Sequence, residues 1–192
     1  MTENADNVLI GARGWRHPGW QDSFYPDDLP QDWQLAYYSN EFSMVVIREH
    51  DWMQIDDMAD LQKECAEGFR FLVEWPVLAA AESLSGHIDR IQQLGSHCAG
   101  VIIQAEQAHA QQQLGTCRSM LPETIPCYFD GYLQSETNSL IKVHTGTNLK
   151  ELRRLMESAL QVPASSPVRV IVEGEPPDIK LLRDTKTLLG LL

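Results

Sequence analysis

The sequence predicts an α/β protein whose parallel β-sheet is covered by helices. Short apolar runs rich in Val and Ile alternate along the chain with amphipathic segments, which is the pattern of parallel strands joined by helices. The runs are continuous rather than alternately apolar and polar, which is typical of strands buried on both faces. With 192 residues the chain is long enough to bury one sizeable core. We therefore expect a single domain over residues 1–192.

Seven apolar runs have the length and composition of strands. They lie at residues 8–12, 44–47, 69–73, 100–103, 125–129, 140–143 and 168–172. Each is four or five residues long, and each is followed by polar sequence.

Helices are expected between these strands, and the end signals of the segments indicate where several of them begin. We expect helices at residues 32–40, 56–66 and 107–113, one capped by Ser85, one opening at Asn148 and one from about Asp178. The segment after Asn148 reads Asn-Leu-Lys-Glu, which resembles a capping box. Gly115 is expected to break the Gln-rich helix.

Charge and composition exclude several classes of function. The formal net charge is −12 and the pI is about 4.8, so the average surface repels phosphate backbones and nucleic acid is not expected as a partner. No apolar run approaches the roughly 20 residues of a membrane helix, and the polar, acidic start lacks the order of a secretion signal. We expect a cytoplasmic protein. A local basic pocket within an acidic surface is compatible with this charge, so a small anionic ligand stays among the candidates.

The cysteines and histidines show no metal or cofactor motif. Cys65, Cys98, Cys117 and Cys127 have no C-x-x-C spacing, so we interpret them as reduced, mostly buried thiols. No P-loop, dinucleotide fingerprint or H-x-x-x-H motif occurs, and we expect no metal and no cofactor. Surface roles are expected for His17, His87, His97 and His109.

The loop at residues 10–30 combines glycines that let the backbone turn after the first strand with aromatic side chains that give the loop its own packing. It resembles the opening signature of the YecE-like family (domain of unknown function 72). The residues that carry the resemblance are Ile10, Gly11, Gly14, Trp15, Trp20, Phe24, Tyr25, Pro26, Leu29 and Pro30. Further family signatures fall on residues 44–52, 69–76, 102–105 and 141–146.

The resemblance implies a TIM-barrel-like (β/α) barrel but no settled activity. Members of the family are longer, and the shortfall here lies between Phe129 and Leu140, where we expect one unit to be missing. A typical barrel uses about 250 residues, with roughly 200 a lower limit. The length therefore predicts a barrel shortened by about one unit, with about seven parallel strands.

Polar or ionisable residues follow every predicted strand. The strand ends are Arg13, Arg48-Glu49-His50, Glu74, Gln104, Asp130, Lys142 with His144, and Glu173. In parallel barrels these ends gather at one rim, where the chemistry is found. Taken alone, each of these residues is explained equally well by a functional role and by its place at the solvated start of a loop. Side chains two residues apart share a face, which groups Lys142 with His144.

The resemblance sharpens the choice of site residues. Gln104 and His144 match the family's inward Gln and His, and Lys142 keeps the charge of its Arg without the bidentate fork. Three positions depart: the family's inward Glu, Asn and Lys are replaced here by Val46, Arg48 and Glu74. This is either a compensating exchange of charges across the pocket or drift after a loss of function.

We expect binding of a small polar or anionic molecule by Arg13, Trp15, Arg48, Gln104 and Lys142. The first alternative is a hydrolase or isomerase in which His144 or Glu74 acts as the base, since imidazole changes charge near neutral pH. The second is a degenerate barrel that serves as a protein-interaction module and forms a homo-oligomer through an open edge near residues 129–140.

Overall fold

The computed structural model describes residues 8–75, 81–104, 107–129, 140–161 and 167–192. The chain divides into two compact units, and each is described here by itself. Unit 1 comprises Met1–Val45 and Glu136–Leu192, and unit 2 comprises Val46–Ser135. The single domain over residues 1–192 stays a prediction.

The strands of unit 1 are parallel and follow the order β1-β7-β6. Strands β1 (Val8–Arg13), β7 (Val168–Glu173) and β6 (Leu140–His144) are held in a register that places His144 opposite Glu173. Their inner residues are almost fully buried, as continuous apolar runs require. Strand β2 (Met44–Ile47) passes from unit 1 into unit 2.

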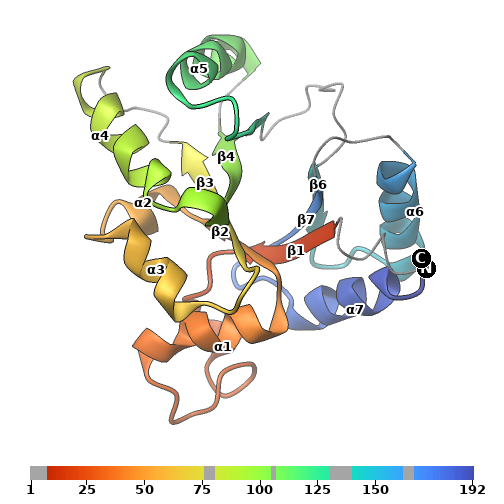
Figure 1. Cartoon of the computed structure of the whole chain (residues 1–192). Helices are drawn as coiled ribbons and strands as arrows, with labels where there is room; N and C mark the ends of the chain where they lie inside the picture. The colour runs from red at the N-terminus through yellow and green to blue at the C-terminus, as the bar shows by residue number, and fades with distance from the viewer. Residues whose placement is uncertain (1–7, 76–80, 105–106, 130–139, 162–166) are drawn as a thin grey trace. The chain divides into compact units, whose positions relative to one another are not determined.

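Three helices accompany these strands, and two begin at the predicted caps. Helix α1 (Gln34–Glu41) follows the short 3₁₀ turns η2 (Pro18–Trp20) and η3 (Gln31–Trp33). Asn148 caps α6 (Leu149–Leu160) by accepting a hydrogen bond from Glu151 N, and Asp178 caps α7 (Ile179–Leu189). Helix α7 contacts β1, α6 contacts β6, and the two helices pack together (Figure 1).

The aromatic loop after β1 forms a packed cluster. Trp20 stacks on Tyr38 with ring centroids 6.0 Å apart, and its indole Nε1 donates to Pro177 O at 2.9 Å. Phe24 and Tyr25 contact the same ring, and all four side chains are buried. A buried indole with its donor satisfied is a packing residue, which agrees with the ordered loop expected from the sequence.

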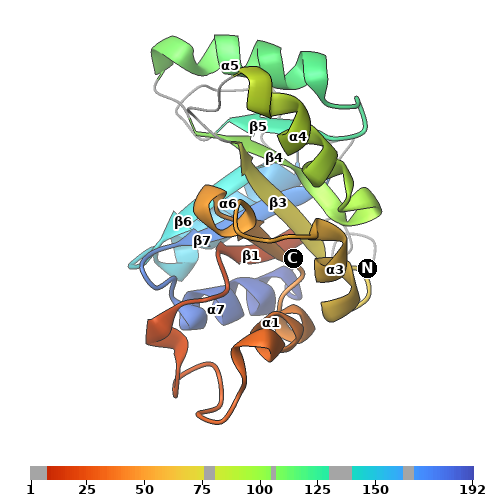
Figure 2. The ribbon, with the colours of Figure 1, turned by 90° about the vertical axis from the view of Figure 1, so that its left-hand side faces the viewer.

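Unit 2 contains the strands β3 (Arg70–Trp75), β4 (Cys98–Ile103) and β5 (Cys127–Phe129), parallel and in the order β5-β4-β3. Figure 2 shows α5 (Gln107–Met120) lying along β4 and β5, which it contacts. The other helices are α2 (Glu49–Trp52), α3 (Met58–Glu64), α4 (Ala81–Gln92) and the 3₁₀ turn η4 (Gly95–His97).

The alternation of parallel strands and helices confirms the predicted α/β class with a TIM-barrel-like arrangement, and all seven predicted strands are found among the described residues. Three helix details were wrong. Ser85 lies inside α4 rather than at its start, Gly115 lies inside α5, and the short α2 was not expected. An exposed glycine costs a helix only about 1 kcal/mol, which neighbouring turns can offset. Most of the segment in which a unit is expected to be missing, residues 130–139, lies outside the described residues.

Candidate functional site

Glu173 is the centre of a charged cluster in unit 1, which we call the Glu173 cluster: Arg13, Lys142, His144 and Glu173. Its Oε1 lies 3.0 Å from Arg13 Nη2 and 3.1 Å from Lys142 Nζ. Its Oε2 lies 3.6 Å from His144 Nδ1, slightly beyond hydrogen-bond distance. The Glu173 side chain is 15% exposed, so these contacts form in a partly desolvated place.

The strands explain why these residues meet. Arg13, His144 and Glu173 are the last residues of β1, β6 and β7. Because the three strands are parallel and adjacent, their carboxyl ends lie at one edge of the sheet. Lys142 precedes His144 by two residues and so shares its face of β6. The structure thus brings Arg13, Lys142 and His144 together at strand ends, as expected from the sequence, and their roles in binding or catalysis stay predictions.

The cluster is locally basic in an acidic protein. Arg13 and Lys142 are basic side chains that share one carboxylate oxygen. With histidine counted as neutral, the four side chains formally carry two positive charges and one negative charge.

His17 positions the end of β1. Its Nε2 donates to Arg13 O at 2.9 Å, its Nδ1 lies 3.1 Å from Glu175 Oε1, and its ring packs on Trp20. The ring is buried, so the surface role expected for His17 was wrong, and the same holds for buried His87. No sequence motif marks the contact between His17 and Glu175, because Glu175 lies 158 residues further along the chain.

Trp15 follows Arg13 by two residues and is 2% exposed. Its carbonyl oxygen accepts a hydrogen bond from Tyr25 Oη at 2.6 Å, and its Nε1 has no hydrogen-bond partner in the part of the chain that the structure describes. Burial raises the pKa of Tyr25 well above its ordinary value, so this donor keeps its proton. The hydrogen bond from Tyr25 holds the backbone of Trp15, and a role of Trp15 in ligand binding stays a prediction.

The remaining candidates belong to unit 2, where Glu74 and Arg48 anchor helix α2. Glu74 is 5% exposed, and its Oε2 accepts a hydrogen bond from Glu49 N at 2.8 Å. The indole of Trp52 donates to Glu74 O, and Arg48 Nε donates to Asp51 Oδ2 at 2.7 Å. Gln104 follows β4 directly and is half-buried. The contacts of Glu74 and Arg48 hold local structure, and roles in ligand binding or catalysis stay predictions for all three.

Glu173 was recognised from the sequence as a strand end but was not among the expected ligand-binding or catalytic residues. Its importance comes from having three partners on two other strands, which only the strand order β1-β7-β6 reveals. The sequence feature that could have identified it is that Glu173 is the carboxylate directly after the apolar run at 168–172.

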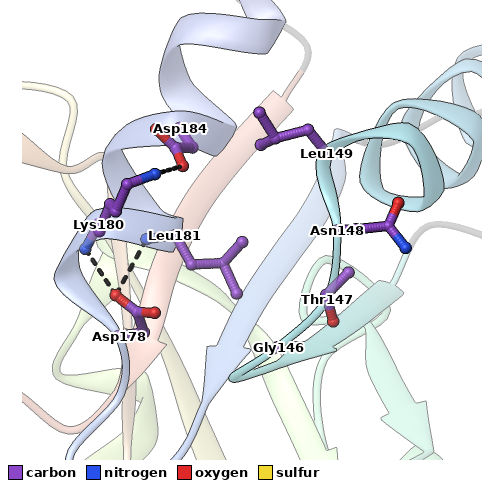
Figure 3. A pocket seen from close by; sticks show the side chains of 8 residues that line it. All are labelled: Gly146, Thr147, Asn148, Leu149, Asp178, Lys180, Leu181 and Asp184. Atoms are coloured by element: carbon purple, nitrogen blue, oxygen red, sulfur yellow. Dashed lines mark hydrogen bonds and ion pairs between the residues drawn. The ribbon is translucent and has the colours of Figure 1, made fainter.

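A hollow of about 340 Å³ lies elsewhere in unit 1, where α6 and α7 begin (Figure 3). Its residues are Gly146, Thr147, Asn148, Leu149, Asp178, Lys180, Leu181 and Asp184. Lys180 Nζ lies 2.6 Å from Asp184 Oδ2, and Asp178 Oδ1 accepts hydrogen bonds from the backbone N–H groups of Lys180 and Leu181. With two carboxylates against one ammonium, this hollow suits an anion less well than the Glu173 cluster does. Among the described residues, no three His, Cys, Asp or Glu side chains are grouped to hold a metal ion.

These observations define an α/β protein with parallel strands and an ionisable cluster at strand carboxyl ends. The sequence profile of the family described as "Protein of unknown function DUF72" matches residues 9–130, more than half of the chain. The chain belongs to this family, which confirms the resemblance seen in the sequence.

The profile covers Arg13, Trp15, Arg48, Glu74 and Gln104, whereas Lys142, His144 and Glu173 lie beyond it. Neither the curated proteins nor the solved structures contain a match to this chain. In the described ranges no helix combines the length and apolar character needed to cross a membrane.

Proposed function

We propose that this protein binds a small polar or anionic molecule at the Glu173 cluster. The observation that carries the proposal is that two basic side chains, Arg13 and Lys142, converge on a single carboxylate oxygen. An anion at this place gains attraction from both cations, and each can donate several hydrogen bonds in different directions.

The chemistry of the two cations indicates the class of ligand. Guanidinium offers a planar fork that fits carboxylate or phosphate, whereas ammonium acts as a compact point charge. The side chains are 17% exposed at Arg13 and 32% exposed at Lys142, so both are within reach of a small molecule and neither is fully solvated. Monophosphates and small carboxylates match the chemistry of both cations, and a sugar acid adds hydroxyl groups.

A thermal-shift panel of inorganic phosphate, small carboxylates and sugar acids tests this function. The native protein should melt at a higher temperature with at least one member. Arg13→Ala and Lys142→Ala should each weaken binding at least tenfold, about 1.4 kcal/mol. Arg153→Ala is the matched control, because it removes an exposed guanidinium on α6 that pairs with Glu157. Equal binding by the native protein and both cluster variants would refute the proposal.

An enzyme of hydrolase or isomerase type is the second candidate, favoured by the approach of His144 to Glu173. A carboxylate near imidazole Nδ1 can orient the ring and support Nε2 as a base. His144 is 68% exposed, so substrate can reach it. His144→Gln should then abolish turnover of a bound panel member while circular dichroism stays unchanged. Turnover that survives in this variant counts against His144 as the base. The interaction-module alternative stays a prediction.

A further inference from the structure

Two cysteines of unit 2 lie in direct contact. Cys117 is in the last turn of α5 and Cys127 is the first residue of β5. Their Sγ atoms are 2.7 Å apart, longer than the roughly 2.05 Å of a disulfide bond. Both cysteines are free thiols in this structure. The ten-residue spacing gave no sign of this contact.

The local fold holds the pair together. Helix α5 packs on β5, and Cys127 is fixed in the sheet opposite Val101 of β4. The connection between the cysteines is short and tight: Leu121 N donates to Cys117 O, and Ile125 N donates to Pro122 O, each at 2.9 Å. Pro122 and Pro126 further restrict the backbone. The two sulfurs therefore meet without any rearrangement of the chain.

The two thiols differ in access. Cys117 is fully buried, whereas Cys127 is half-buried and so can be reached from solvent. Cys65 Sγ contacts Gln62 O and His97 Nδ1, and Cys98 Sγ contacts Gly100 O. An oxidant can therefore reach Cys127, and Cys117 lies next to it, where it can attack the oxidised sulfur.

We propose that Cys117 and Cys127 form a redox modification site at which a hydroperoxide converts the two thiols into a disulfide. The Cys127 thiolate attacks one peroxide oxygen and becomes the sulfenic acid, while the O–O bond breaks and the alcohol leaves with a proton. Cys117 Sγ then attacks Cys127 Sγ, and the sulfenic hydroxyl leaves as water with the Cys117 proton. The two sulfurs lose two electrons in all, and the peroxide is reduced to one alcohol and one water.

The electrostatics of the pair agree with these roles. A hydrogen bond from Cys117 lowers the pKa of the Cys127 thiol against the effect of burial, and the Arg118 guanidinium lowers it further. The same contact and burial raise the pKa of Cys117. Burial raises the pKa of Cys65 as well. Cys127 is therefore a better nucleophile than Cys65 or Cys117.

The test oxidises the full chain with one equivalent of hydrogen peroxide after reduction and desalting. Denaturation in N-ethylmaleimide should then label two of the four cysteines, and the unlabelled pair should have lost two hydrogen atoms in mass. Cleavage after Glu106, Arg118 and Glu123 separates Cys98, Cys117 and Cys127 into different peptides, so the crosslink can be assigned without reduction. Recovery of peptides from Cys117 and Cys127 as one species supports the proposal. Four labelled thiols, or a crosslink to Cys65 or Cys98, overturns it.

Variants separate the two roles. Cys117→Ser should retain oxidation at Cys127 but stop at the sulfenic acid, which dimedone traps. Cys127→Ser should lose peroxide sensitivity at this site, and the control Cys65→Ser with Cys98→Ser should still form the crosslink. Dimedone labelling of Cys117 in the Cys127→Ser variant, at the rate seen for Cys127, would contradict the assigned roles. Circular dichroism of each variant confirms the fold, and peptide mapping of the native chain requires no variant.

Discussion

Lys142 Nζ and Glu173 Oε1 lie 3.1 Å apart across the neighbouring strands β6 and β7, and Arg13 contacts the same oxygen from β1. The carboxylate thus offsets the repulsion between two cations. This relationship makes the cluster both a structural contact and the proposed ligand site.

Glu173→Gln should separate these two roles. Removing the negative charge leaves Arg13 and Lys142 facing an amide, so we expect the free energy of unfolding to fall by about 1–3 kcal/mol. Binding of phosphate or carboxylate should become stronger, since the competing carboxylate is gone. Urea denaturation and calorimetry measure the two effects. Weaker anion binding in a folded Glu173→Gln variant would show that the carboxylate itself contacts the ligand.

Gly11→Ala should be strongly destabilising. A Cβ at Gly11 would lie 1.9 Å from Met44 O, a backbone atom that cannot move without displacing β2. We expect a loss of about 3 kcal/mol or more, or failure to fold. Gly86→Ala is the matched control, because nothing lies within 4 Å of its added Cβ and alanine favours the exposed helix by about 1 kcal/mol. Equal melting temperatures for the two variants would be incompatible with this packing.

Tyr38→Phe should cost about 1–3 kcal/mol of unfolding free energy, because it removes a fully buried hydroxyl that bridges two backbone groups. Tyr38 Oη accepts a hydrogen bond from Ala12 N at 2.8 Å and donates one to Met44 O at 3.1 Å. Tyr37→Phe removes a neighbouring, half-buried hydroxyl and should have a smaller effect. Chemical denaturation compares the two variants. If Tyr38→Phe is no less stable than Tyr37→Phe, the bridge contributes nothing.

The ion pair between Glu41 and Arg183 should stabilise unit 1 in a pH-dependent way. Arg183 donates to both Glu41 carboxylate oxygens at 2.7 and 3.2 Å and lowers the Glu41 pKa below its ordinary value of 4.5. A lowered folded-state pKa means that the stabilisation is complete above pH 4.5 and is lost as the pH falls through the folded pKa.

Glu41→Gln should therefore melt at a lower temperature than the native protein at pH 7, and the difference should shrink under acid. Glu157→Gln removes an exposed pair with Arg153 on α6 and should change stability by less than about 0.5 kcal/mol. A difference at Glu41 that grows as the pH falls would reverse the expected sign.

The sequence predicted the strands well because burial on both faces leaves a continuous apolar run. Strand β2 has the expected bounds of 44–47, and β7 extends only one residue beyond its run, to Glu173. The caps at Asn148 and Asp178 were visible because each satisfies backbone donors within three residues of itself. Apolar runs and capping residues were therefore enough to predict where these strands and helices lie.

Contacts between distant segments could not be predicted in the same way. The convergence on Glu173 depends on β7 lying between β1 and β6, and the buried ring of His17 contacts Glu175 from a distant part of the chain. Cys117 and Cys127 meet only because α5 packs back onto β5. In each case the tertiary structure brings the partners together, and the spacing of the residues along the sequence does not predict this contact.

Backbone amide chemical shifts measured during an anion titration locate a ligand bound at the Glu173 cluster. With the panel member that gives the largest thermal shift, we expect saturable changes around Arg13, His144 and Glu173, and their absence in Lys142→Ala. Changes confined to Lys180, Leu181 and Asp184 would place the ligand in the hollow beside α7 and contradict the Glu173 cluster as the binding site.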